Sequence, residues 1–443
     1  MHIPTYFAVI LLFISSAVTA QIEDDLIGLY DEDELVTIAT GTAKEARFAP
    51  SVASVITAKD IKLSGAKTLD QALEMVPGLH VSASFNRQDA IYSIRGIHTG
   101  QNPQVLLLID GVRVDQLFSG ARPYNYSLPV ANIERIEVIR GPGSAVYGAD
   151  AFAGVISVTT KTAQHQSGDE VGVSSGSFGT REIWLNKDIN IGSAQVSASV
   201  NHVKTDGDDD RYIKHKLLYE GALNTNREIL NVKLNMTDNW GSLDIFSWHL
   251  ANAGNGSGGL QIPDPIGGDK IDFSGFRFVS PKIQIENGWA INKYLATSIL
   301  DQDSKFYLLP PGHPVFPEGM QGNPGGLQKN YEGGVTFFYD KKLNHSLRYS
   351  IGFRNQKFTA SESKNFDNLG NPTGILDDVT GDPSRIYILD KEREHYFISL
   401  QDEWRFANDW ELTAGLRYDS FTQFGDSVNP RLALVWSTAY NLT

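Results

Sequence analysis

The 443-residue sequence contains no cysteine, which excludes disulfide bonds and thiolate metal ligands. Basic residues are also scarce, because 38 Lys and Arg stand against 52 Asp and Glu, for a formal net charge of −14. A nucleic-acid-binding surface needs a basic patch, so this balance argues against nucleic acid as a partner. The ten histidines are scattered without metal-site spacing. We therefore expect no metal and no cofactor.

No apolar run is long enough to span a membrane as a helix. The apolar residues 6–14 are too few, and a small-residue segment that ends at Ala20 follows them. This order is typical of a secretory signal peptide, although only His2 stands where Lys or Arg is usual. We interpret residues 1–20 as a signal peptide and expect an exported protein. The alternative is a buried N-terminal strand.

The sequence also lacks a phosphate-binding loop, although a glycine-rich turn follows the β-branched run at residues 136–139. Gly141 and Gly143 fit the first two positions of a dinucleotide fingerprint, but Val146 occupies the third. Pro142 removes one of the N–H donors that such a loop would offer. No G-x-x-x-x-G-K-[ST] segment occurs. The glycines therefore indicate tight turns and close backbone packing rather than a nucleotide site.

Residues 21–49 form an acidic segment, with seven acidic and no basic residues up to position 40. Such a segment cannot bury enough apolar surface to fold alone, so we expect an extended tail. Within it, residues 33–40 (DELVTIAT) form a short β-prone stretch.

Residues 50–161 are expected to form a compact α+β domain. Thr57 and Asp60 form a capping pattern at the start of a short helix. A second helix is predicted at 68–76, where Thr68 and Gln71 form a capping box and Pro-Gly ends the helix. Three further strands are predicted at 105–111, 133–141 and 154–161.

Residues 162–443 consist of alternating segments of roughly ten residues. Short connections alternate with long ones, which we place at 204–226, 252–270, 308–327 and 359–391. This alternation is typical of an outer-membrane β-barrel, whereas a soluble β-sandwich would not explain it. Tryptophans near strand ends are expected to form the interfacial girdles. They are Trp248, Trp404, Trp410 and Trp436.

We count about twelve candidate strands here, whereas a barrel that holds a plug of more than a hundred residues needs about 22. Open sheet edges in lipid would cost several kcal/mol per unsatisfied group. We therefore expect the chain to be part of a longer protein, either as an incomplete sequence or as a truncated, non-transporting remnant.

Several motifs resemble those of TonB-dependent outer-membrane receptors. They are EMVPGL at 74–79, IRG at 94–96, LLLIDG at 106–111 and NIERIEVIRGPGSAVYGADAFAGVISVTTK at 132–161. The resemblance implies an α+β plug domain inside an antiparallel transmembrane barrel of 22 strands, in the outer membrane of a Gram-negative bacterium. Such receptors import ferric siderophores, haem or cobalamin, with energy delivered by TonB. A signalling receptor usually has an additional N-terminal domain, for which residues 21–50 are too few.

The resemblance also implies roles for particular residues. A coupling segment, the TonB box, would lie upstream of the plug, and a β-prone segment there could add as a strand to the sheet of a partner. Our candidate consists of Asp33, Glu34, Leu35, Val36 and Thr37, with a plain linker as the alternative. The expected plug–barrel seat consists of Arg95, Arg140, Glu134, Glu137, Gly141 and Gly143. For Glu134, a simple surface ion pair is the alternative.

Two plug loops that would point outward carry arginine together with aromatic residues. They offer Phe85, Arg87, Arg122, Tyr124 and Tyr126. These residues suit an anionic ferric siderophore through charge and cation–π contacts, or they merely line a wet cavity. Haem ranks second because these loops contain no histidine, and cobalamin ranks third because it is nearly neutral. We expect no enzyme, since G-x-S-x-G at 172–176 lies in an alternating strand without a strand-to-helix elbow.

Overall fold

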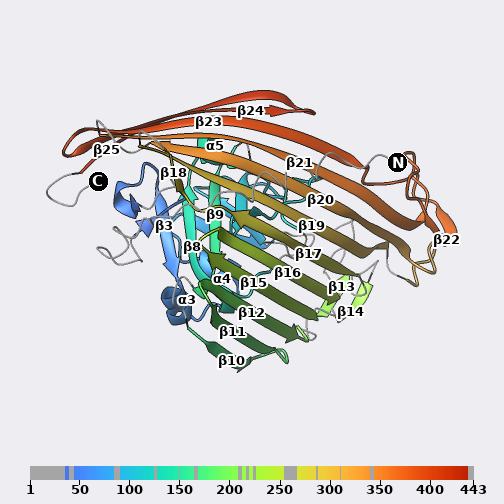
Figure 1. The fold of residues 1–443 in the computed structure, drawn as a ribbon. Coiled ribbons are helices and arrows are strands. Elements are labelled where there is room, and N and C mark those ends of the chain that lie inside the picture. The colour runs from blue at the N-terminus through green and yellow to red at the C-terminus, as the bar shows by residue number, and fades with distance from the viewer. Residues whose placement is uncertain are drawn as a thin grey trace.

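A computed structural model shows a long, curved sheet that wraps around a smaller α+β unit (Figure 1). The residues that it describes are 35–38, 44–83, 90–123, 127–148, 150–163, 168–207, 212–215, 219–222, 226–253, 267–285, 288–309, 311–339 and 344–437. The expected signal peptide lies outside these ranges.

The α+β unit, here called the plug, is built on a five-stranded sheet in the order β3-β8-β9-β6-β7. β6 and β9 run parallel, and the other neighbours are antiparallel. The hairpin of β4 with β5 was not anticipated from the sequence. The strands are β3 (Ala53–Thr57), β4 (Leu79–Ala83), β5 (Ala90–Ile94), β6 (Val105–Ile109), β7 (Val112–Arg113), β8 (Ile133–Arg140) and β9 (Gly154–Thr160).

The two predicted helices are present, and their caps explain where they begin. Helix α3 (Ala58–Ser64) starts with the expected reciprocal capping box of Thr57 and Asp60. Helix α4 (Leu69–Leu73) is shorter than predicted and its box is not reciprocal, because the Gln71 side chain accepts from the Lys67 N–H instead. The remaining helical turns are α5 (Ser144–Tyr147), η3 (Ala46–Phe48) and η4 (Val130–Asn132). None of the helices that the structure describes has the length and apolarity needed to cross a membrane.

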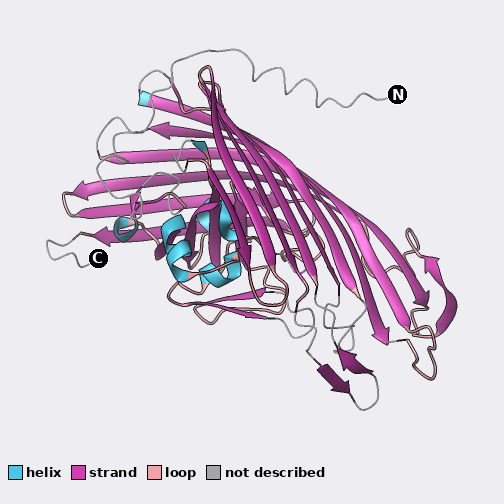
Figure 2. Cartoon of the chain, turned by 90° about the horizontal axis from the view of Figure 1, so that it is seen from below, coloured by secondary structure: helices cyan, strands magenta, loops and turns pink. Residues whose placement is uncertain are grey.

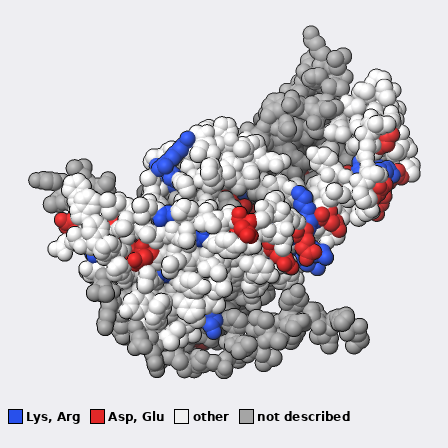
Figure 3. Space-filling view, turned by 90° about the horizontal axis from the view of Figure 1, so that it is seen from above, with Lys and Arg blue, Asp and Glu red and all other residues white. Residues whose placement is uncertain are grey.

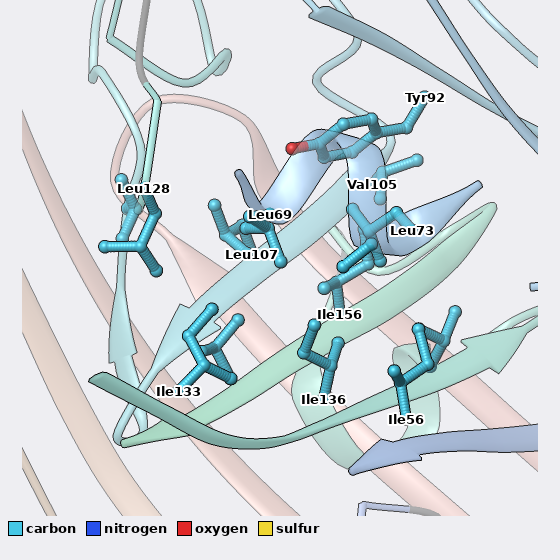
Figure 4. Packing of buried hydrophobic residues seen from close by; sticks show 14 of the residues in the cluster. Ile56, Leu69, Leu73, Tyr92, Val105, Leu107, Leu128, Ile133, Ile136 and Ile156 are labelled. Atoms are coloured by element: carbon cyan, nitrogen blue, oxygen red, sulfur yellow. The ribbon is translucent and has the colours of Figure 1, made fainter. Parts of the chain in front are cut away.

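Helix α4 packs its apolar face on the plug sheet (Figure 4). Leu69 and Leu73 lie over Leu107 and Ile156, and all four side chains are buried. The same apolar cluster continues into the surrounding wall. It includes Ile229, Trp248, Leu250, Ile271, Phe273 and Leu300.

Twelve strands form the wall as an antiparallel meander, in which each strand pairs with the next along the path from β10 to β25. The number of strands agrees with the sequence-based count. Figure 2 shows the plug helices on the concave side of this sheet. β10 and β25 each have one neighbour, so the sheet is open within the described residues. The strands are β10 (Glu170–Ser175), β11 (Arg181–Ile191), β12 (Ala194–Thr205), β15 (Arg227–Asp238), β16 (Gly241–Ala253), β17 (Gly268–Val279), β19 (Trp289–Leu309), β20 (Met320–Tyr339), β21 (His345–Phe366), β23 (Lys391–Ala407), β24 (Trp410–Phe421) and β25 (Gly425–Trp436).

Two shorter strands pair with strands of this wall, and two others form a hairpin of their own. β18 (Ile283–Gln284) pairs with β19, and β22 (Pro372–Asp378) pairs with β21. β13 (Tyr212–His215) and β14 (Tyr219–Ala222) form a separate hairpin.

Strands extend into two of the predicted long loops. β20 begins at Met320, inside the expected loop 308–327, and β21 continues to Phe366 inside 359–391. The Gly- and Pro-rich residues 322–326 indicated a loop, but they pair with β21 along their length. Pairing with the neighbouring strands therefore outweighs the low intrinsic strand propensity of these residues.

Aromatic side chains gather at one end of the wall. Trp410 and Trp436 stack at 5.3 Å between ring centroids, and Trp404 stacks on His345 at 5.4 Å. Trp248 is different, because it is buried in the cluster shared with the plug, so its assignment to a girdle was wrong. Large parts of the outer face in Figure 3 carry no charged side chain.

Candidate functional site

Residues 35–38 lie against the plug rather than extending away from it. β1 (Leu35–Val36) pairs antiparallel with β2 (Lys44–Glu45), and Val36 is completely buried. Val36 and Ile38 pack on a small apolar cluster of the plug sheet that includes Leu108 and Val155. This docking differs from the expected extended tail. Asp33 and Glu34 of the candidate TonB box lie outside the described residues.

The docked segment is held by the side chain of Glu137 on β8. Its carboxylate accepts hydrogen bonds from the backbone N–H of Thr37 at 2.8 Å and from the Thr37 hydroxyl at 3.0 Å. A third bond comes from the N–H of Ile38 at 2.9 Å. Hydrogen bonds to a charged acceptor are stronger than neutral ones. A single carboxylate therefore replaces the neighbouring strand that these N–H groups would otherwise need.

Two further plug side chains contact the carbonyl groups of the segment. Arg135 forms an ion pair with Glu137 at 3.2 Å and donates a hydrogen bond to the carbonyl of Leu35. The Tyr147 hydroxyl donates to the carbonyl of Ile38 at 3.1 Å. Burial raises the pKa of Tyr147 to about 12, so this hydroxyl keeps its proton at neutral pH. The plug thus binds both the N–H groups and the carbonyl groups of this segment.

Lys44 connects the same N-terminal region to the wall. Its ammonium group lies 2.6 Å from a carboxylate oxygen of Glu403 on β23 and also contacts Glu411 on β24. All three side chains are largely buried. Because β2 pairs with β1, the wall holds the strand that borders the docked segment.

The arginines of the expected plug–barrel seat lie close together. Arg140 donates to the carbonyl of Pro77 and to the hydroxyl of Ser54 at 3.1 Å, both within the plug. Burial, together with the positive charge of Arg95, lowers the pKa of Arg140. Arg95 is exposed and has φ +53°. The roles proposed for these arginines in seating the plug remain predictions.

The glycines of the expected seat follow the end of β8, whereas Glu134 lies near the start of that strand. Gly141 has φ +138°, and a Cβ there would lie 3.5 Å from a guanidinium nitrogen of Arg95. At Gly143 a Cβ would lie 2.6 Å from a methyl carbon of Val155. A side chain at Gly143 would therefore require this packing to shift. Glu134 is half-buried on β8.

A charged group that the sequence analysis did not single out joins the plug to the wall. The ammonium of Lys233 on β15 lies 2.8 Å from Asp110 of the plug and 3.0 Å from Asp244 on β16. Asp110 also accepts hydrogen bonds from the N–H and hydroxyl of Thr160, both at 2.9 Å. Burial alone would raise the pKa of Asp110, but Lys233 and Thr160 outweigh it, and the pKa is lowered.

Further polar side chains join the plug to the wall. The Leu117 N–H donates to the Gln328 side chain at 2.6 Å, and Gln116 contacts Gln302. Arg431 donates to the Ser51 hydroxyl at 2.6 Å. Each of these bonds has a modest net free energy, because water can replace either partner when the bond is broken.

Most of the expected ligand-binding residues cannot be placed. Phe85, Arg87, Tyr124 and Tyr126 lie outside the described residues. The guanidinium of Arg122 lies 3.7 Å from the centroid of the Tyr92 ring and donates to the carbonyl of Ala90. Arg122 is therefore held on the plug by Tyr92 and by Ala90, the residue that follows the undescribed range 84–89 in the sequence.

Other candidate sites lack the geometry for chemistry. The G-x-S-x-G segment runs along β10, which pairs with β11 and leads into no helix. Among the described residues, no group of three or more His, Asp or Glu side chains is arranged to hold a metal ion.

Family models match two parts of the chain. The model described as TonB-dependent receptor plug domain matches residues 45–155, and the model described as TonB dependent receptor-like, beta-barrel matches residues 185–443. Together with the fold, these matches agree with the resemblance seen in the motifs.

Curated relatives match the chain over about a third of its length. A vitamin B12 transporter of Vibrio vulnificus is 40% identical over 148 residues, which cover 33% of this chain and 24% of the transporter. An iron-regulated outer membrane virulence protein of Vibrio cholerae is 37% identical over 143 residues, covering 30% and 21%. The matched segments are thus less than a third of either relative.

Among solved structures, the ferripyoverdine receptor of the outer membrane of Pseudomonas aeruginosa superposes with a TM-score of 0.67 at 14% identity. The match covers 96% of this chain and 59% of that receptor. At this identity the likeness concerns the fold alone.

Proposed function

Because the chain belongs to the TonB-dependent receptors, which are β-barrel proteins of the outer membrane, we propose that it takes part in importing a scarce ligand across that membrane, with energy delivered through TonB. Members of this family are receptors and transporters rather than enzymes. The outer face of the wall would contact outer-membrane lipid.

The docked segment carries this proposal. We assign energy coupling to residues 33–37, of which Leu35, Val36 and Thr37 are described. Extended segments bind partner proteins by adding a strand to a sheet edge, and this requires free backbone N–H and C=O groups. The backbone groups of Thr37 and Leu35 are occupied by Glu137 and Arg135. TonB would therefore have to compete with these plug side chains and with the short pairing of β1 to β2.

A polar seat supports a plug that can be displaced. Gln328 with Leu117 and Gln302 with Gln116 are contacts that water can replace. The plug could then shift without exposing a large apolar surface along this part of the wall.

For the ligand we propose an anionic ferric siderophore. Arg87 and Arg122, with Phe85, Tyr124 and Tyr126, would supply positive charge and aromatic faces. Haem ranks second, since residues 84–89 and 119–127 contain no histidine. One observation favours cobalamin instead: the chain is 40% identical to a vitamin B12 transporter over 148 residues.

The test is uptake by cells in which the full-length protein is the only receptor for the ligands offered. Radiolabelled ferric catecholate, ferric hydroxamate, haem and cobalamin are supplied to cells with and without TonB. We expect TonB-dependent accumulation of a ferric siderophore. Accumulation of cobalamin alone would replace the proposed ligand, and uptake that does not depend on TonB would contradict the coupling.

A further inference from the structure

A cavity of about 450 Å³ separates the plug from the wall on the side of β17 to β24. Plug residues Gly111, Ala145 and Tyr147 line one face of it, and Tyr294 and Phe338 are among the residues on the other. Ligand pockets have volumes of about 300–1,000 Å³. The cavity is therefore large enough for a small ligand or for part of a larger one.

The lining of this cavity is strongly cationic. Six Lys and Arg side chains face it, and Glu332 is the one carboxylate among the described lining residues. The cations are Arg113, Arg277, Lys282, Arg348, Arg354 and Arg417. We call this cavity with its six cations the cationic chamber.

Carboxylates pair with three of these six cations. Arg113 forms an ion pair with Asp150 and lies 3.8 Å from Asp115. Arg354 donates to Glu332 at 3.0 Å. Arg417 is paired with Asp419 at 2.8 Å and also donates to the carbonyl of Val146 on the plug. Arg113, Arg354 and Arg417 are therefore structural, because each already has a fixed anionic partner.

Arg277 differs from these three arginines. Its Nε is buried and has no hydrogen-bond partner among the described residues. Its guanidinium carbon lies only 2.7 Å from the position that a Cβ at Gly111 would occupy. Gly111 therefore leaves the space in which this guanidinium lies against the plug. A buried N–H without an acceptor is unfavourable, so an acceptor that enters the chamber would satisfy it.

The opposite side of the plug shows that this excess is local. There Lys233 is neutralised by Asp110 and Asp244 within 3.0 Å. Next to it, the plug shares an apolar cluster with Trp248 and Phe273 of the wall. The positive charge is thus concentrated in the chamber and is not a general property of the plug–wall boundary.

We propose that the cationic chamber is a second binding site that takes multiply charged oxyanions on the plug–wall boundary. Arg277 and Arg348 would bind carboxylate or phosphate oxygens, because a planar guanidinium pairs with such groups through two parallel hydrogen bonds. The rings of Phe338 and Phe397 add apolar walls. The oxyanion is either part of an anionic metal chelate in transit or a free inorganic anion. Only the transit interpretation rests on the proposed import function.

The test uses the full chain purified in detergent, with calorimetric titration of two probes. Inorganic pyrophosphate represents a free oxyanion, and ferric citrate represents an anionic chelate. We expect saturable binding that weakens with ionic strength. Arg277→Gln with Arg348→Gln should weaken binding by about ten-fold or more, because two charge-assisted donors are lost. Arg277→Lys retains the positive charge and should recover part of the affinity.

Lys329→Gln is the matched control, because it removes one positive charge from an exposed position on β20 outside the chamber. It should leave the affinity unchanged. Removing cations that repel one another should not unfold the protein. If the double variant nevertheless does not fold, binding is measured with Arg277→Gln alone. Binding of pyrophosphate without ferric citrate would identify a free anion as the occupant.

The chamber proposal is overturned if neither probe binds, if the arginine variants bind as well as the parent, or if Lys329→Gln weakens binding equally. Uptake of a siderophore without oxyanion binding would overturn the chamber alone. Oxyanion binding without any TonB-dependent uptake would overturn the import function and leave the chamber in place.

Discussion

The carboxylate of Glu137 accepts two hydrogen bonds from Thr37, one from its backbone N–H and one from its hydroxyl, across 100 residues of sequence. Glu137→Gln would replace one acceptor oxygen by an NH2 group and remove the charge. Bonds to charged groups contribute about 1.5–3 kcal/mol each, so we expect residues 35–38 to detach more often. Hydrogen exchange at Thr37 and Ile38 should accelerate by about ten-fold or more.

Glu134→Gln is the matched control for this experiment, since it makes the same change three positions earlier on β8. It should leave exchange at Thr37 and Ile38 unchanged. Equal acceleration in both variants would mean that the plug as a whole is loosened, and the specific role of Glu137 would be rejected.

Val36→Pro should abolish uptake and leave ligand binding at the cell surface intact. Proline lacks the N–H that an added strand would donate and does not fit in the middle of that strand. Val36→Ala keeps the N–H and should retain uptake. Uptake that survives the proline would show that residues 33–37 are not the coupling segment.

Lys233→Met should destabilise the folded protein by about 3–5 kcal/mol, because Asp110 and Asp244 would be left buried without their cation. The measurement is the free energy of unfolding in urea, with the protein in detergent. Adding Asp110→Asn should restore part of the loss. Lys187→Met removes an exposed partner of Asp169 and should cost less than about 1 kcal/mol. Similar losses in both variants would argue against a special role for the buried group.

Acid should weaken the attachment of the plug through Asp110. The folded state lowers the pKa of this carboxyl below its ordinary value of 3.8, because Lys233 and Thr160 outweigh the effect of burial. Its contribution to stability is therefore complete above the unfolded pKa and is lost as the pH falls through the folded pKa. Unfolding measured from pH 5 downward should show this loss, and Asp110→Asn should remove that part of the pH dependence.

Arg87→Ala with Arg122→Ala should weaken binding of a ferric siderophore to the full-length protein. Because Arg122 also lies on the Tyr92 ring, Arg87→Ala alone is needed to separate ligand contact from plug stability. Tight haem binding that the double variant does not alter would show that these arginines are not ligand residues.

Local patterns predicted many of the helices and strands but not the contacts between them. The alternation in β15 exposes Val232 and Leu234 and thereby predicts that Lys233 faces inward. Its partner Asp110 lies 123 positions away, and no local pattern specifies that pairing. The prediction that Trp248 belongs to a girdle failed for the same reason. A tryptophan near a strand end suits a lipid interface and an apolar plug contact equally well.

The docking of residues 35–38 was missed because low apolar content and negative charge predicted an extended tail. Burial of Val36 depends on Glu137 and Arg135, which lie on β8 and supply the polar partners of its neighbours. A composition argument does not include partners that the fold brings from elsewhere in the chain.

The two sides of the plug are attached to the wall by contacts of different kinds, and this determines how it would move. Near β16 and β17 the plug shares apolar surface with Trp248 and Phe273, and separating that surface costs about 25 cal/mol per Å². Toward β20 to β24 it meets the cationic chamber and polar groups, which water can replace. The apolar contact on that side is smaller, and it joins Leu117 and Phe118 of the plug to Phe358 and Ala360 of β21. A pull on the N-terminal segment should therefore rotate the plug about the β16–β17 side as a hinge. The first continuous water path would then open along β20 to β24.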